Sequence, residues 1–448
     1  MTISANTVWE VRTGGSDNNG GGFVTGASGT DRSQQDAAHA TLTALSLVHT
    51  TTSQINVSLV DYTVTAADIG NILQITGGTA TAGLFQITAA DTVNNRWTVD
   101  RSAGTAAQTV VGAMGGAFAS PGKAAAATTV DGNLIWVKAG TYTITTATPG
   151  AAGPVLLTSN IRTKMEGYSS TRGDRAGRPE LNAGAVTTVN LFAHGTADTM
   201  AFVHMKTNGN SQSAVSGFVI TSPRVYVFDC LAVNCDQANA EGFDIATDGA
   251  AIVACGASAC TIGFNNSAGD GSFHRCWADA CGTGFSLNGL CWAVECVASD
   301  CTGDGFNVPN SSGGGFIGCT ADGNGGDGFD LGSFARLVAW CAATNNTGVG
   351  FANASLSFLD YCASYNNSAR SSGSPLVDSN PITLTGDPWT NAAGDDYSPN
   401  NTAGAGASLR NIAGDVYGQT DNRDIGAVQH ADPAGGSVAA KPLGGFIG

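Results

Sequence analysis

Two aspartates hold equivalent places in the chain and could do acid–base chemistry together. Asp304 and Asp327 each stand directly before a Gly-Phe pair. Hydrolysis of a glycosidic bond uses two carboxyl groups about 5 Å apart for retention, or roughly 6.5 to 9.5 Å apart for inversion. Neighbouring layers of a stacked fold could supply either spacing. Asp before Gly is also ordinary turn sequence, so we favour a structural role for both residues and expect no catalytic residue.

Basic residues, which a polysaccharide lyase would need as the proton acceptor, are scarce in the same region. Only Arg275 and Arg336 occur between Cys230 and Asn367. Arg275 stands one place before a cysteine, and Glu295 holds the same place in the next repeat. This spacing predicts an ion pair at the surface, a contact that contributes about 0–1 kcal/mol, rather than a catalytic base.

The remaining titratable groups give no pattern of metal ligands. Asp279, Asp300 and Asp322 follow cysteine strands and are expected in turns. Of the six histidines, His194 and His204 are ten positions apart, and we interpret both as solitary. Cysteines five positions apart on successive repeats do not have a zinc spacing. We therefore expect no metal and no other cofactor.

Three aromatic residues are candidates for contact with a glycan or a partner. Trp340 and Tyr361 directly precede a cysteine, and Trp277 directly follows one. Their places in the repeat predict side chains that point outward. Exposed rows of aromatic side chains bind sugars or pack against another subunit, and the sequence leaves both alternatives open.

These residues lie in a repeat of about 21 to 23 positions. Successive segments begin at Cys230, Cys255, Cys276, Cys296, Cys319, Cys341 and Cys362. An alanine, or a serine in the last segment, follows two positions later, and a Gly-Phe pair follows further on. Alternation along a strand buries the cysteine and alanine on one face, and the phenylalanine fills the wider part of the core. A stacked repeat of this period predicts an all-β, right-handed parallel β-helix.

All twelve cysteines lie between Cys230 and Cys362, and these columns contain eleven of them. As small apolar residues in a ladder they are expected to be buried free thiols, because stacked parallel side chains rarely reach disulfide geometry. The last three segments carry Asn324, Asn346 and Asn367 where earlier ones carry a second cysteine. This predicts a ladder of side-chain amides that bond coil to coil.

The rest of the chain suggests four parts. Residues 1–38 form a strand and a loop, and residues 39–113 an inserted small antiparallel β domain suited to docking. Residues 114–432 form the β-helix, with a capping helix at 120–127 in which Ser120 is the N-cap and Pro121 the first position. Residues 433–448 are rich in Gly, Pro and Ala and form an arm.

Composition excludes several classes of protein. The formal net charge of −16 disfavours a surface that follows nucleic-acid phosphates. No run of 18 apolar residues is present, so no membrane span is expected. The first residues lack a basic end followed by an apolar run, so no secretory signal is expected.

Several motifs together resemble pectate-lyase-like β-helix proteins. They are the strand Val8-Trp9-Glu10-Val11, the loop Gly15-Ser16-Asp17-Asn18-Asn19-Gly20, the capping helix, the strand and turn at 136–142, and a closing strand at 424–430. With the insertion, the combination is similar to β-helix structural proteins of tailed bacteriophages. That resemblance alone implies a virion.

The resemblance implies a non-enzymatic structural protein of a tailed-phage virion, made in the host cytoplasm and placed on the virion surface. Our leading hypothesis is a homotrimeric decoration or cement protein that contacts the major capsid protein, because no separate anchoring domain is evident at the N-terminus. The alternative is a tailspike or tail fibre that binds or cuts host surface polysaccharide. A cellular enzyme of the pectate-lyase type is disfavoured by the missing signal and the scarcity of basic residues.

Overall fold

The structure is a computed structural model that describes residues 3–128, 130, 132–157, 163–194, 201–267, 269–309, 313–333, 336–353, 356–394, 396–410 and 425–426. It divides into two units, residues 1–272 with 278–282, and residues 273–277 with 283–448. The expected closing strand at 424–430, apart from residues 425–426, and the arm at 433–448 lie outside the described residues.

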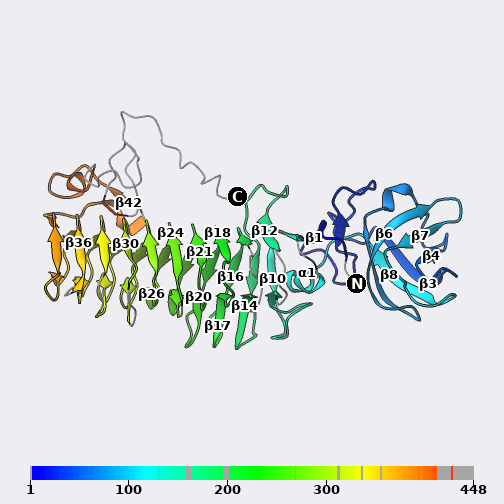
Figure 1. Ribbon diagram of the computed structural model, residues 1–448, viewed down its shortest axis with the longest axis horizontal. Coiled ribbons are helices and arrows are strands. Elements are labelled where there is room, and N and C mark those ends of the chain that lie inside the picture. Colours follow the sequence, from blue (N-terminus) through cyan, green and yellow to red (C-terminus); the bar gives the residue numbers. More distant parts are fainter. Residues whose placement is uncertain are drawn as a thin grey trace. The chain divides into compact units, whose positions relative to one another are not determined.

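Both units contain a parallel β-solenoid, which confirms the predicted fold (Figure 1). Each coil gives one strand to each of three sheets. Sheet 1 contains, in the first unit, β2 (Gly22–Val24), β1 (Thr7–Val11), β9 (Leu134–Lys138), β12 (Lys164–Tyr168), β15 (Ala201–Val203), β18 (Tyr226–Phe228) and β21 (Ala250–Val253), and in the second unit β27 (Trp292–Val294), β30 (Gly315–Ile317), β33 (Leu337–Ala339), β36 (Phe358–Asp360) and β39 (Val377–Ser379). Only β1 and β2 among these pair antiparallel in the described chain.

The other two sheets follow the same scheme. Sheet 2 contains β10 (Thr141–Thr143), β13 (Glu180–Asn182), β16 (Lys206–Asn208), β19 (Leu231–Val233) and β22 (Gly256–Ser258), and in the second unit β28 (Val297–Ser299), β31 (Thr320–Asp322), β34 (Ala342–Thr344), β37 (Ala363–Tyr365) and β40 (Ile382–Thr383). Sheet 3 contains β11 (Val155–Leu157), β14 (Val189–His194), β17 (Val215–Ile220), β20 (Glu241–Ile245) and β23 (Ile262–Asn266), and in the second unit β26 (Thr283–Leu287), β29 (Phe306–Asn307), β32 (Phe329–Asp330), β35 (Val349–Ala352) and β38 (Ala369–Ser371). Strands β24 (Gly271–His274) and β25 (Trp277–Asp279) fall where the units divide.

The repeated cysteine, alanine and phenylalanine side chains form the core of the coils. All twelve cysteines are described, and each is a buried free thiol, which confirms the prediction that they form no disulfides and lie in the core. Phenylalanine rings of successive coils stack, with centroids 4.7 Å apart for Phe285 and Phe306 and 4.8 Å apart for Phe306 and Phe329. This distance matches the strand spacing of a sheet. Glycine precedes phenylalanine because the layers approach closely there: a Cβ on Gly305 would lie 2.9 Å from the Gly328 carbonyl oxygen.

Two columns of left-handed residues produce the sharp turns at either end of the sheet 2 strands. The residue before the first cysteine of each coil has a φ between 49° and 60°: Asp229, Ala254, Arg275, Glu295, Gly318, Trp340 and Tyr361. The residue before the second cysteine or the asparagine has a φ between 50° and 68°: Asn234, Ala259, Ala280, Asp300, Gly323, Asn345 and Asn366. Because a Cβ makes this conformation costly, by roughly 1–2 kcal/mol, surrounding coil-to-coil bonds must hold it.

The predicted asparagine ladder is present in the second unit. The Asn324 side-chain amide donates to the Asn346 oxygen at 2.8 Å, and the Asn346 amide donates to the Asn367 oxygen at 2.9 Å. The backbone N–H of each donor residue bonds to the same oxygen, at 3.1 Å for Asn324 and 3.0 Å for Asn346. Asparagine can replace cysteine here because neighbouring coils satisfy its buried polar atoms.

The predicted small antiparallel β domain is a closed barrel in the first unit, with strand order β3-β4-β7-β6-β5-β8. Its strands are β3 (Ala40–Val48), β4 (Gln54–Asn56), β5 (Ile72–Gly78), β6 (Gly83–Asp91), β7 (Arg96–Val99) and β8 (Thr109–Met114), with a 3₁₀ turn η1 (Ala66–Asp68). Trp97 and Phe85 are buried in its core. The chain enters and leaves the barrel at one place, since the His39 N–H bonds to the Met114 carbonyl at 2.9 Å.

The predicted capping helix is α1 (Pro121–Ala127). The Ser120 hydroxyl accepts a hydrogen bond from the Lys123 N–H at 3.3 Å, so Ser120 is the N-cap and Pro121 is the first helical residue. The alanines of α1 are largely buried, and the helix contacts β1, β9 and β11. It therefore covers the first strands of the solenoid.

After the last coil, the chain of the second unit folds back onto sheet 2. It contains β41 (Trp389–Asn391), β42 (Asp396–Pro399) and the 3₁₀ turns η3 (Ala392–Gly394) and η4 (Gly406–Ser408). Trp389, Leu409 and Ile425 are buried against alanines of β34 and β37. The Gly426 N–H bonds to the Trp340 carbonyl at 2.9 Å. The outer face of these coils is therefore covered by the protein's own chain.

Candidate functional site

The two candidate aspartates lie in equivalent turns and bond to the next coil. The Asp304 Oδ1 accepts from the Asp327 backbone N–H at 2.8 Å, and the Asp327 Oδ1 accepts from the Val349 N–H at 2.6 Å. The second oxygen of Asp304 accepts from the Asn307 amide at 2.9 Å. Burial raises the pKa of Asp327, with further contributions from the negative charges of Asp304 and Asp330. These contacts give both carboxyl groups a structural part as caps between coils.

The three candidate aromatic residues differ in their surroundings. Trp277 is 40% exposed on β25. Trp340 and Tyr361 are half-buried and pack against the cluster formed by Trp389, Leu409 and Ile425. The expected exposure of Trp340 and Tyr361 is therefore wrong, because the segment after the last coil covers the column in which they lie.

Charged residues of the same column pair between coils. The predicted contact of Arg275 with Glu295 is present at 2.7 Å. His204 is not solitary, since its Nδ1 lies 2.7 Å from a carboxylate oxygen of Asp229, which also pairs with Arg178. The interpretation of His204 as solitary is thus corrected: Asp229 follows it by one coil length, a spacing that the repeat contains.

A third carboxyl group, which the sequence did not point to, lies on the outward side of sheet 3 and has a clearly raised pKa. Asp244 on β20 is half-buried, and burial raises its pKa to about 6, with a further contribution from the negative charge of Glu241. The Glu241 carboxylate accepts a hydrogen bond from the Ser216 hydroxyl at 3.0 Å. A carboxyl group whose pKa is raised in this way is better suited to act as a general acid than an ordinary aspartate.

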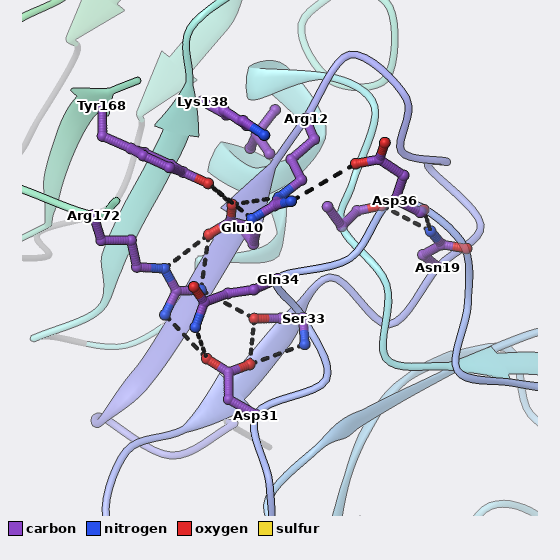
Figure 2. Close-up of polar contacts among 12 residues, drawn as sticks. Glu10, Arg12, Asn19, Asp31, Ser33, Gln34, Asp36, Lys138, Tyr168 and Arg172 are labelled. Atoms are coloured by element: carbon purple, nitrogen blue, oxygen red, sulfur yellow. Dashed lines mark hydrogen bonds and ion pairs between the residues drawn. The ribbon is translucent and has the colours of Figure 1, made fainter. Parts of the chain in front are cut away.

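Figure 2 shows a buried cluster of charges at the beginning of the solenoid. Glu10 of β1 is fully buried, and its two carboxylate oxygens contact Arg12 and Arg172, each at 2.8 Å. The Tyr168 hydroxyl of β12 donates to the same carboxylate. Burial raises the pKa of Tyr168, and the Glu10 charge raises it further, so the hydroxyl remains a donor.

This Glu10 cluster also holds the loop that leads into the barrel. Arg172 contacts Asp31 at 3.0 Å and donates to the Ser33 hydroxyl at 3.1 Å (Figure 2). Arg32, which lies between Asp31 and Ser33, donates its backbone N–H to the side chain of Asn71, directly before β5 of the barrel, at 2.9 Å. A continuous set of polar contacts therefore runs from the first coils into the stem of the inserted domain.

The rim of the barrel exposes large apolar side chains. Leu45 of β3, Leu59 and Val60 after β4, and Val93 between β6 and β7 are 62%, 73%, 82% and 91% exposed. We call these four residues the barrel rim.

Hydrogen bonds hold the segments that carry the rim together. The Thr43 N–H and hydroxyl of β3 bond to Asp61 at 3.0 Å and 2.7 Å. The Asn95 amide, close to Val93, donates to the carbonyls of Val57 and Tyr62 at 2.8 Å and 2.9 Å. These bonds fix the segment after β4, which carries Leu59 and Val60, to β3 on one side and to the turn near Val93 on the other.

A second apolar surface follows the outward side of sheet 1 in the second unit. Trp292, Gly315, Leu337, Phe358 and Val377 are in register on five successive strands. Leu290, Leu356 and Leu376 lie just before three of these strands and are also exposed. We call these eight residues the apolar row. The sequence contained the signal, since the members on the strands recur at the coil period.

In the part of the chain that the structure describes, no group of three or more His, Cys, Asp or Glu side chains is placed to hold a metal ion. Within the same residues, no helix is both long enough and apolar enough to cross a membrane.

No protein-family model matches the chain, and no curated protein matches it. Similar solved structures include pectate lyase Pel9A, with 15% identity, a TM-score of 0.48, and coverage of 70% of this chain and 92% of that one. A mannuronan C-5 epimerase A-module from Azotobacter vinelandii has 12% identity, a TM-score of 0.40, and coverage of 59% and 76%. A protein of Geobacillus virus E2 has 12% identity, a TM-score of 0.36, and coverage of 56% and 52%. The likeness concerns the fold: the chain is a parallel β-helix whose neighbours include a pectate lyase and a viral protein.

Proposed function

We propose that this chain is a non-enzymatic structural protein of a tailed-phage virion, a homotrimeric decoration protein that attaches to the capsid through its inserted barrel. The observation that carries the proposal is the barrel rim. Four large apolar side chains are 62–91% exposed on one small domain. Clustered apolar exposure marks a surface that another protein covers.

The attachment of the barrel to the solenoid supports a docking role for the barrel. Both ends of the insertion meet at the hydrogen bond between His39 and Met114. The contacts from Glu10 through Arg172 and Asp31 then hold the stem. A docking domain held in this way transmits its position to the coils, as attachment to a lattice requires.

The turns of the second unit support the proposal that the protein is not an enzyme. One carboxylate oxygen of Asp304 and one of Asp327 each accept a hydrogen bond from a backbone N–H of the next coil. A general acid or a nucleophile must reach the substrate with its oxygens, so these bonds favour the structural interpretation. The Asp304→Asn, Asp327→Asn double variant should assemble normally, and it should show no difference from the wild type when host capsule or lipopolysaccharide is the substrate.

The test of the proposal is attachment to particles of the phage that encodes the chain, prepared without it. Purified protein should bind such particles, and a Leu59→Asp, Val60→Asp variant should not, because two charges would have to be buried at the contact. The matched control is Thr81→Asp, Ala82→Asp, an exposed pair in the turn between β5 and β6. Equal attachment of the rim variant, or loss of attachment in the control as well, would refute docking through the rim.

A tailspike that binds or cuts host polysaccharide is the second candidate, and Asp244 is the observation that favours it. Its raised pKa, about 6, and the neighbouring Glu241 are features of an acid–base pair. Cleavage of host polysaccharide by the purified protein, with loss in Asp244→Asn but not in the Asp304→Asn, Asp327→Asn variant, would replace the structural proposal.

A further inference from the structure

We propose that the apolar row on sheet 1 of the second unit is the surface through which copies of this chain associate. This inference rests on the proposed function, in which the protein is a homotrimer. It adds the face of contact, which neither the repeat nor the barrel identifies.

The row is regular along the coils. Trp292 pairs with Gly315, and Gly315 pairs with Leu337 on the next strand. The series continues through Phe358 to Val377. A Cβ on Gly315 would lie 3.1 Å from the Trp292 ring, so the indole lies along this surface and covers the glycine.

The row is exposed although its members are apolar. Trp292, Leu337, Phe358 and Val377 are 38%, 40%, 43% and 41% exposed, and Leu290, Leu356 and Leu376 are 51%, 45% and 57% exposed. Together these seven side chains expose on the order of 600 Å², the upper end of what the largest apolar patch of a monomer shows. That area exceeds the apolar share, about 450–520 Å², of the roughly 800 Å² that each partner gives to a stable interface.

Charge argues for a second copy as the occupant. The chain carries a net charge of −16, so two copies repel each other wherever their acidic surfaces meet. The row on the strands has no ionisable residue, and the neighbouring outward row, Val294, Ile317, Ala339, Asp360 and Ser379, has one. This face is therefore a place where copies can approach closely.

The chemistry of the row disfavours other occupants. An anionic membrane surface needs basic residues, which the row lacks. A glycan needs hydrogen-bonding groups beside aromatic rings, whereas most members of the row are aliphatic. Another copy presents side chains at the same coil spacing, so the two rows can interlock along their length. Around a three-fold axis, three such rows would face one another.

The test is the oligomeric state of the full chain, measured by sedimentation equilibrium over a wide concentration range. The wild type should be oligomeric, and a Leu337→Glu, Phe358→Glu variant should dissociate, with an apparent dissociation constant raised at least about 100-fold because two side chains are lost and two charges added. The single substitution Leu376→Glu, at the most exposed position of the row, should by itself weaken association. Unchanged circular dichroism and melting would show that these variants are folded.

The control is Leu59→Asp, Val60→Asp on the barrel rim, which should stay oligomeric. A monomeric wild type, or a Leu337→Glu, Phe358→Glu variant as oligomeric as the wild type, would overturn the inference. A rim variant that remains oligomeric but attaches to particles would refute the docking proposal and leave this inference standing. Loss of oligomers in the rim variant would place the contact on the barrel and contradict the inference.

Discussion

Replacement of Phe285 by alanine should destabilise the second unit severely. The ring is fully buried, stacks on Phe306 at 4.7 Å and meets the edge of Phe273 at 6.2 Å. Truncation of a buried phenylalanine lowers the free energy of unfolding by about 3–5 kcal/mol, and this figure includes the lost contacts between the rings. The cost should lie in the upper part of this range, because neighbouring coils are fixed in register and cannot collapse into the cavity that the ring leaves.

The assay is urea unfolding followed by circular dichroism. With a slope of about 3 kcal/mol per molar urea, a loss of about 4 kcal/mol lowers the midpoint by more than about 1 M. Phe285→Leu keeps most of the buried volume and loses only the ring contacts, so its midpoint should lie between the two. An alanine variant that unfolds at the wild-type midpoint would mean that Phe285 is not a core residue and that the register is wrong.

Three further outcomes are expected. Thiol reagents should modify few cysteines in the native protein and all twelve after denaturation, because every cysteine is buried; two or more disulfides in the intact mass would contradict this. Burial raises the pKa of Asp322, so the native state binds its proton more tightly than the unfolded state, and stability from this group is lost as the pH rises through the native pKa. Asp322→Asn should abolish that pH dependence and unfold at neutral pH no more easily than the wild type, whereas Asp322→Ala should lose bonds to Thr344 and Trp389. Ala280→Gly should stabilise by about 0.5–1 kcal/mol, since Ala280 has a φ of 51°, and Ala278→Gly in the adjacent strand should destabilise; melting curves with the opposite order would refute the turn assignment.

The repeat could be read from the sequence because one structural cause recurs at each coil. Cys230 and its equivalents, the Gly-Phe pairs and the asparagines occupy fixed places, so their period gives the strands, the core and the ladder. The helix at 120–127 was equally local, since Ser120 and Pro121 mark its beginning. Local signals of this kind need no knowledge of distant contacts.

The contacts that depend on distant segments could not be predicted. Glu10 bonds with residues 158 and 162 positions away, and nothing in the loop around Arg172 indicates that partner. Trp340 and Tyr361 do lie in an outward column, but the cover supplied by Trp389 comes from beyond the repeat. The apolar row did have a periodic signal, which the more conspicuous cysteine columns obscured.

The coils of the second unit bond strand to strand with their immediate neighbours, and this makes length an adjustable property. Val297 and Thr320 occupy equivalent places on consecutive coils. Removal of residues 297–319 would join Cys296 to Thr320 and shorten the stack by one layer, about 4.8 Å, without changing its cross-section. Duplication of the same segment would lengthen it equally. A protein built in this way can change its reach in whole steps while every remaining contact stays of a kind already present.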